Sequence, residues 1–165
     1  MINTIESMHE HLQWALELEH ATIPPYLCAL YSIKEGSNQE SVEVIKSVFI
    51  EEMLHMALVA NILVATGGKP RLDYPGFMKK YPTPLPHSDK SFEVNLNKFS
   101  PESIDCFLKI ERPTDADAPS QDDEFSSIGQ FYKAIEEGLI HLSNKIGEGD
   151  LFVGNPEHQV TAETT

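Results

Sequence analysis

Two short stretches of this 165-residue sequence carry most of its information about architecture. Residues 17–27 read Glu-Leu-Glu-His-Ala-Thr-Ile-Pro-Pro-Tyr-Leu, and residues 51–55 read Glu-Glu-Met-Leu-His. In both stretches a carboxylate falls on the apolar side of a segment with helical periodicity. Since an unpaired buried carboxylate is costly, this pattern indicates two helices that pack around a polar site.

The segment around the first stretch is predicted to be a helix from about residue 4 to about residue 34. Its apolar residues recur with a helical rhythm, at Leu12, Leu16, Ile23, Leu27 and Leu30. Pro24 and Pro25 interrupt that rhythm. Because an interior proline removes a backbone donor and clashes with the preceding turn, we expect a kink or a break there.

Further helices are predicted at about 39–66, about 101–111 and about 127–146. The helix at 39–66 is apolar on nearly every side, so we expect it to be buried in a bundle or between two layers. The helix at 101–111 is short, with Ser100 as its N-cap and Pro101 as its first residue.

Residues 67–125 hold eight of the eleven prolines and are predicted to form a long, loop-rich insertion. Residues 154–165 are polar, and we expect a flexible tail there. The prediction is therefore a single all-α domain over residues 1–165, with three long helices and one short helix in the insertion. A fourth bundle helix is absent from this prediction.

Composition narrows the class of protein. Lys and Arg total 12 against 26 Asp and Glu, a net charge of −14. This balance argues against nucleic-acid partners and against an anionic membrane surface. Charged residues break the apolar runs, the first ten residues lack the apolar core of a signal peptide, and the two cysteines form no disulfide framework. We expect a cytoplasmic protein without a membrane span.

The spacing Glu-x-x-His occurs three times, at Glu6 and His9, Glu17 and His20, and Glu52 and His55. With 18 Glu and 7 His in the chain, chance alone predicts about 0.8 such pairs, so the spacing by itself is weak evidence. The helical wheel separates them. Glu52 falls near the centre of its apolar stripe and His55 about 60° to one side, still on the buried face. The other two pairs are predicted to be solvated.

Glu19 is the second buried carboxylate, within about 40° of the centre of the first helix's apolar stripe. Few cations are available to pair with it, because the nearby lysines lie at helix ends or off the stripe. Carboxylates with an imidazole suit iron, manganese or zinc. A Glu from one helix and a Glu-x-x-His from the next are half of a dinuclear site in a helical bundle. A metal-free Glu–His hydrogen-bond pair is the alternative.

For several other side chains the sequence does not assign a single role. Tyr26 lies two turns past Glu19 on the same face, so it can pack in the core or hydrogen-bond a ligand carboxylate. The helix at about 127–146 offers Glu136, Glu137 and His141, but all three lie off its apolar stripe. The sequence identifies no catalytic residue.

These motifs resemble the ferritin-like domain of the iminophenyl-pyruvate dimer synthase family. The resemblance rests on residues 17–27, residues 51–55 with Asn61, and shorter matches at 99–102, 110–113, 128–132 and 134–135. It implies a ferritin-like bundle with a dinuclear centre of iron or manganese, in which Glu19, Glu52 and His55 are metal ligands. It also implies an oxidoreductase acting on a small molecule, such as an amino-acid-derived imine, with the insertion as a lid or wall of the substrate site.

The missing half of the site leaves three alternatives open. The chain can be a fragment or short version of a longer protein, or a second copy can supply the other ligands across a two-fold axis. It can also bind one metal ion weakly, or none. The functional alternatives to an enzyme are a non-catalytic ferritin-like module for metal binding or interaction, and a purely structural bundle.

Overall fold

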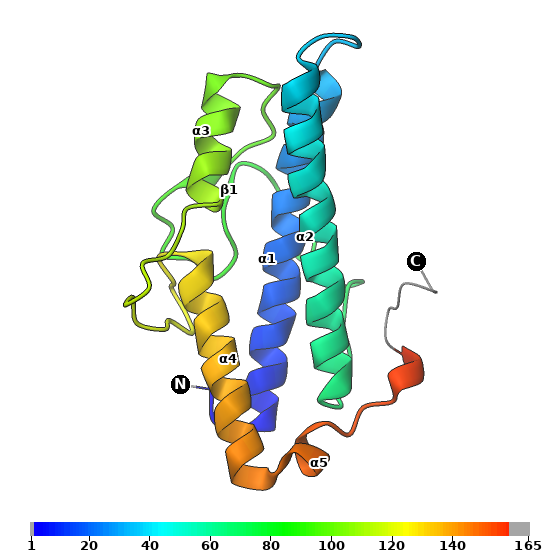
Figure 1. Cartoon of the computed structure of the whole chain (residues 1–165), viewed down its shortest axis with the longest axis vertical. Coiled ribbons are helices and arrows are strands. Elements are labelled where there is room, and N and C mark those ends of the chain that lie inside the picture. The colour runs from blue at the N-terminus through cyan, green and yellow to red at the C-terminus, as the bar shows by residue number, and fades with distance from the viewer. Residues whose placement is uncertain (1, 159–165) are drawn as a thin grey trace.

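Three long helices and one shorter helix build the molecule (Figure 1). The computed structural model describes residues 2–158. The long helices are α1 (Ile5–Ser32), α2 (Gln39–Ala65) and α4 (Ile128–Ile146), and the shorter one is α3 (Pro101–Ile110). These bounds agree with the predicted ranges to within about two residues, the usual uncertainty of a helix end. The all-α prediction is confirmed, and residues 2–158 contain no further long helix.

The helix α1 lies at the centre of the arrangement. It runs beside α2 along its length, while α3 and α4 lie along its other side, one above the other (Figure 1). Two short helical segments follow α4, at Glu148–Leu151 (α5) and Pro156–His158. Within the insertion, β1 (Thr83–Pro84) and β2 (Glu93–Val94) pair antiparallel, with Thr83 opposite Val94.

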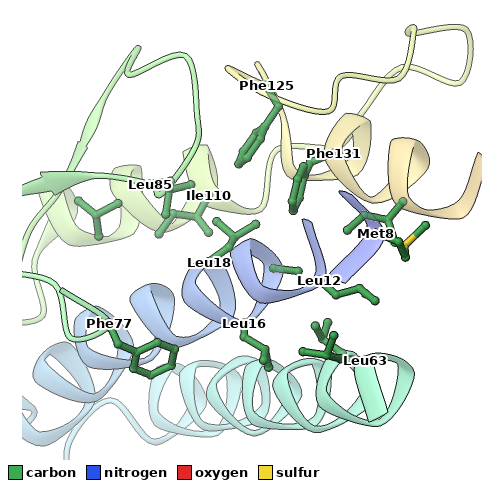
Figure 2. Packing of buried hydrophobic residues seen from close by; sticks show 14 of the residues in the cluster. Met8, Leu12, Leu16, Leu18, Leu63, Phe77, Leu85, Ile110, Phe125 and Phe131 are labelled. Carbon is green, nitrogen blue, oxygen red and sulfur yellow. The ribbon is translucent and has the colours of Figure 1, made fainter. Parts of the chain in front are cut away.

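The hydrophobic core follows the buried face of α1. Leu12, Leu16 and Leu18 of α1 are 1% exposed or less. Figure 2 shows them meeting side chains from the other helices and from the insertion, namely Leu63, Phe77, Leu85, Ile110, Phe125 and Phe131. The insertion therefore covers α1 with apolar side chains of its own and completes the core.

Of the kink or break expected at Pro24 and Pro25, the break does not occur, because α1 continues through both residues. Proline at position 25 has no N–H to donate to the carbonyl of Ala21, four residues earlier. The hydroxyl of Tyr81, from the insertion, donates to that carbonyl instead, at 2.7 Å. A side chain distant in sequence thus satisfies the acceptor that the proline leaves open.

The prediction that the helix at 39–66 is buried in a bundle or between two layers holds for one face only. Only Ile45, Glu52, Val59 and Leu63 of α2 are fully buried. Its exposed apolar face, which consists of Ile50, Met53, Leu54 and Leu58, is about half exposed throughout. The reason is that α2 packs on α1, whereas no other long helix among residues 2–158 covers its far side.

The same composition makes α2 long and apolar enough to cross a membrane, the one such helix among the described residues. A bundle helix passes this test as well, so it is weak evidence for a membrane. Glu51 and Glu52 lie in the middle of this helix, where a membrane span would carry a large cost for charge.

The start of the polar segment predicted as a flexible tail is attached to α2. The N–H of Gly154 donates to the carbonyl of Ala65 at 2.9 Å. A Cβ atom at position 154 would lie 1.7 Å from the carbonyl oxygen of Val64, so only glycine allows this approach. Residues 159–165 of the predicted tail lie outside the described residues.

Candidate metal centre

The structure brings the three predicted ligands together. Glu19 comes from α1, and Glu52 and His55 come from α2, which lies beside it. The Nδ1 atom of His55 lies 3.7 Å from Oε2 of Glu19 and 3.5 Å from Oε1 of Glu52. One potential ligand atom of each residue lies within 4.8 Å of the others, and this is the one such group among the described residues.

Burial differs sharply within the group. Glu19 is 3% exposed and Glu52 is 5% exposed, as their positions on the apolar stripes predicted. The His55 side chain, expected on the buried face, is 49% exposed. The difference arises because His55 lies toward the part of α2 that no neighbouring helix covers. The two carboxylates form the floor of the site and the imidazole lies at its open side.

Two hydroxyl groups orient the buried carboxylates. The Thr22 hydroxyl donates to Oε2 of Glu52 at 2.6 Å, and the Tyr132 hydroxyl of α4 donates to Oε1 of Glu19. Such partners around metal ligands restrict the ligands to one orientation. Sequence reasoning assigned neither role. The position of Thr22, three residues after Glu19, was an available local signal, whereas Tyr132 depends on how α4 packs.

The electrostatics of the group favour proton or metal binding. Burial, followed by the charge of Glu19, raises the pKa of Glu52 to about 8. The Glu19 carboxylate beside it raises the pKa of His55 to about 9, although burial opposes this shift. Among residues 2–158, no Lys or Arg side chain forms an ion pair with Glu19 or Glu52. Without a metal ion, the raised pKa values of Glu52 and His55 favour protons on this group, which reduce its negative charge.

The residues therefore fit a divalent metal ion. Two buried carboxylates and one imidazole converge without a lysine or arginine partner among the described residues, and this donor set suits iron, manganese or zinc. A metal ion would replace the protons that the group otherwise needs.

A third carboxylate, Glu111, lies near this group and was missed. It follows the last residue of α3 and lines the same cavity as Glu19, Glu52 and His55. Its charge contributes to the raised pKa of Glu52 and of His55. In the sequence, Glu111 stood out only as part of the match at residues 110–113. The short helix before it lies in the insertion and not among the long bundle helices, so no metal ligand was expected there.

The cavity next to the site has a volume of about 590 Å³, in the range that accommodates small molecules. Its walls are mostly apolar and come from α2, α3, α4 and the segment between α3 and α4, for example Val59, Ile62, Ile110, Pro113 and Ile128. The insertion therefore forms one wall of the cavity, as the predicted lid or wall requires. Apart from Glu19, Glu52, His55 and Glu111, few polar side chains line the cavity; they include Arg112 and Thr114.

Tyr26 packs in the core, one of its two predicted roles, and its hydroxyl bonds Glu111 rather than a predicted ligand. Its side chain is 1% exposed and its ring packs against Phe107, with ring centroids 4.5 Å apart. Its hydroxyl donates to Oε1 of Glu111 at 2.5 Å. The candidates on α4 behave as predicted, because Glu136, Glu137 and His141 are all exposed.

The prediction that the other Glu-x-x-His pairs are solvated is only partly right. Glu6 is exposed. Glu17 is not, because the insertion folds over it: its carboxylate accepts from the Tyr74 hydroxyl and from Lys79 Nζ, the latter at 2.5 Å. The His20 ring packs against Phe77, with centroids 4.7 Å apart. Neither pair joins the metal-ligand group within the described residues.

Comparison with known proteins agrees with this architecture. A family model described as ferritin-like matches residues 12–165. The chain belongs to the ferritin-like family. A solved structure described as a ferritin-like protein from Caulobacter vibrioides matches this ferritin-like chain with a TM-score of 0.79 and 28% sequence identity. The match covers 99% of this chain and 59% of that chain, so the present chain spans about three fifths of its relative. No curated protein matches it.

Proposed function

We propose that this ferritin-like protein binds iron or manganese through Glu19, Glu52 and His55 and acts as a metal-dependent oxidoreductase on a small molecule. The observation that carries the proposal is the convergence of two buried carboxylates and an imidazole beside a cavity of about 590 Å³. Buried acidic groups in a concave, mostly apolar site are typical of functional sites.

The residues of the chain have distinct tasks in this proposal. Bound iron or manganese would supply Lewis acidity and redox chemistry to a molecule in the cavity. Thr22 and Tyr132 hold the carboxylates of Glu52 and Glu19 in place through their hydroxyl groups. Apolar side chains of α2 and α4 line the cavity, together with residues 110–114 of the insertion.

The proposed substrate is a small aromatic imine. The resemblance of residues 17–27 and 51–55 to the iminophenyl-pyruvate dimer synthase family supports an amino-acid-derived imine and oxidative coupling. The size and apolar lining of the cavity are compatible with one aromatic molecule of that kind. The match covers 59% of the solved relative's chain. For this reason the enzymatic activity is proposed for the present chain and is not taken from a full-length relative.

The second candidate function is a non-catalytic metal-binding or interaction module. The half-exposed His55 and the lack of a second Glu-x-x-His at the group, within the described residues, favour it. A homodimer is the matching proposal for a partner, because a two-fold axis would supply the missing Glu and Glu-x-x-His. The exposed apolar face of α2 supports such an interface.

Elemental mass spectrometry of the purified protein tests the metal site. The parent, a Glu52→Ala/His55→Ala double variant and a Glu136→Ala/His141→Ala control are compared. We expect near-stoichiometric iron or manganese in the parent and the control, and none in the double variant. One ion per two chains would indicate a centre shared across a dimer.

Turnover separates the two candidate functions. Oxygen consumption by the metal-loaded parent, in the presence of imines prepared from aromatic 2-oxo acids and ammonia, is expected for the enzyme. Metal binding without turnover on any such substrate would favour the non-catalytic module. A parent that stays metal-free after reconstitution would contradict both functions.

A further inference from the structure

Glu111 caps a different helix from the two that carry the predicted ligands, but it lines the same cavity. It is the C-terminal cap of α3, and its backbone N–H donates to the carbonyl of Phe107 at 2.9 Å. Its backbone position is therefore determined by the end of that helix. Its side chain lines the same cavity as Glu19, Glu52 and His55, although none of those residues is on α3.

Tyr26 restrains the Glu111 carboxylate. Tyr26 is on α1, two turns past Glu19 and on the same face of the helix. Packing against Phe107 of α3 and burial in the core restrict its ring to one position. The hydroxyl at the end of that ring donates to Oε1 of Glu111 at 2.5 Å. A buried residue of the ligand-bearing helix thus holds a carboxylate from a different element at the wall of the site.

We propose that Glu111 is a fourth protein ligand of the metal ion held by Glu19, Glu52 and His55, and that Tyr26 positions it. This inference rests on the proposed function. It gives the centre three carboxylates and one imidazole, a donor set suited to iron or manganese. In a complete bundle site a further carboxylate comes from another long helix. Here the residue that caps α3, within the insertion, supplies one in its place.

The competing explanation is that the Tyr26–Glu111 hydrogen bond only joins α3 to α1. The two explanations differ in their consequence for metal binding. A structural bond affects the free energy of unfolding of the metal-free protein but leaves the affinity for metal unchanged. A ligand role lowers the affinity for metal when Glu111 loses its charge.

Titration with Mn²⁺, followed by the electron paramagnetic resonance signal of the free ion, measures that affinity. The proteins are the parent, Glu111→Gln, Tyr26→Phe and the control Glu102→Gln. Glu102 is an exposed carboxylate in the first turn of the same helix α3, so its variant removes the same charge away from the site. Thermal unfolding of the metal-free proteins checks that each variant folds.

We expect Glu111→Gln to weaken Mn²⁺ binding by at least about tenfold, and Tyr26→Phe to weaken it by up to about tenfold, as loss of an outer-shell partner does. Glu102→Gln should bind as the parent does. If the parent binds Mn²⁺ and both Glu111→Gln and Tyr26→Phe match it, the inference is overturned while the proposed function stands. If the parent binds no Mn²⁺, the inference about Glu111 and the proposed function are both contradicted.

Discussion

Replacing Glu52 by glutamine is expected to change how the metal-free protein responds to pH. Burial and the charge of Glu19 raise the pKa of Glu52 from 4.5 to about 8. Between these values the folded protein holds a proton that the unfolded chain has released. The free energy of unfolding must therefore fall as pH rises through this window. The pKa of His55, raised from 6.5 to about 9, extends the fall with the same sign.

The magnitude follows from the two pKa values of Glu52. The difference between 4.5 and about 8 corresponds to on the order of 5 kcal/mol of stability lost by pH 9, at about 1.4 kcal/mol for each pH unit. Glutamine has nearly the same shape and can still accept the hydrogen bond of Thr22, but it never becomes charged. Glu52→Gln should therefore match the parent at pH 5 and exceed its stability by a few kcal/mol at pH 9.

Urea unfolding of chelator-treated protein at pH 5, 7 and 9, followed by circular dichroism, measures the effect. The control is Glu136→Gln, which removes the same charge from the exposed side of α4 and so accounts for general charge repulsion. The control should follow the pH dependence of the parent. The reasoning is refuted if the parent keeps a constant stability from pH 5 to pH 9, or if Glu52→Gln loses stability as steeply as the parent does.

Three further predictions concern the supporting contacts. Tyr132→Phe removes the donor to Glu19 while keeping the ring, and should weaken Mn²⁺ binding about tenfold in a calorimetric titration; unchanged affinity would contradict the role assigned to this hydroxyl. Tyr81→Phe leaves the Ala21 carbonyl of α1 without its donor and should lower the free energy of unfolding by about 1–3 kcal/mol in urea. Added Mn²⁺ at about 100 times its dissociation constant should stabilise the parent by about 2.7 kcal/mol in the same assay, but should not stabilise a Glu52→Ala/His55→Ala variant.

The sequence was sufficient for the parts of the fold that depend on local periodicity. The start of α3 at Ser100 follows from capping chemistry, and the helical wheel placed Glu19 and Glu52 on buried faces. The juxtaposition of these two carboxylates required only that α1 and α2 pack on each other, as consecutive helices joined by a short connection do.

The parts that depend on distant contacts could not be predicted. The donor to the Ala21 carbonyl left open by Pro25 is Tyr81, and the partners of the Glu17 carboxylate are Tyr74 and Lys79, all from the insertion. Glu111 reaches the site only through the placement of α3. The exposed apolar face of α2 could not be predicted either. An apolar composition indicates that a helix is buried, but it does not say which element covers each of its faces.

The most direct test of the central claim is a crystal structure of the Mn²⁺-loaded protein with anomalous diffraction recorded at the manganese edge. The account predicts an anomalous peak between α1 and α2, within about 2.0–2.3 Å of a carboxylate oxygen of Glu19, a carboxylate oxygen of Glu52 and a ring nitrogen of His55. A peak elsewhere on the molecule, with Glu19 and Glu52 still paired to Tyr132 and Thr22 alone, would contradict it.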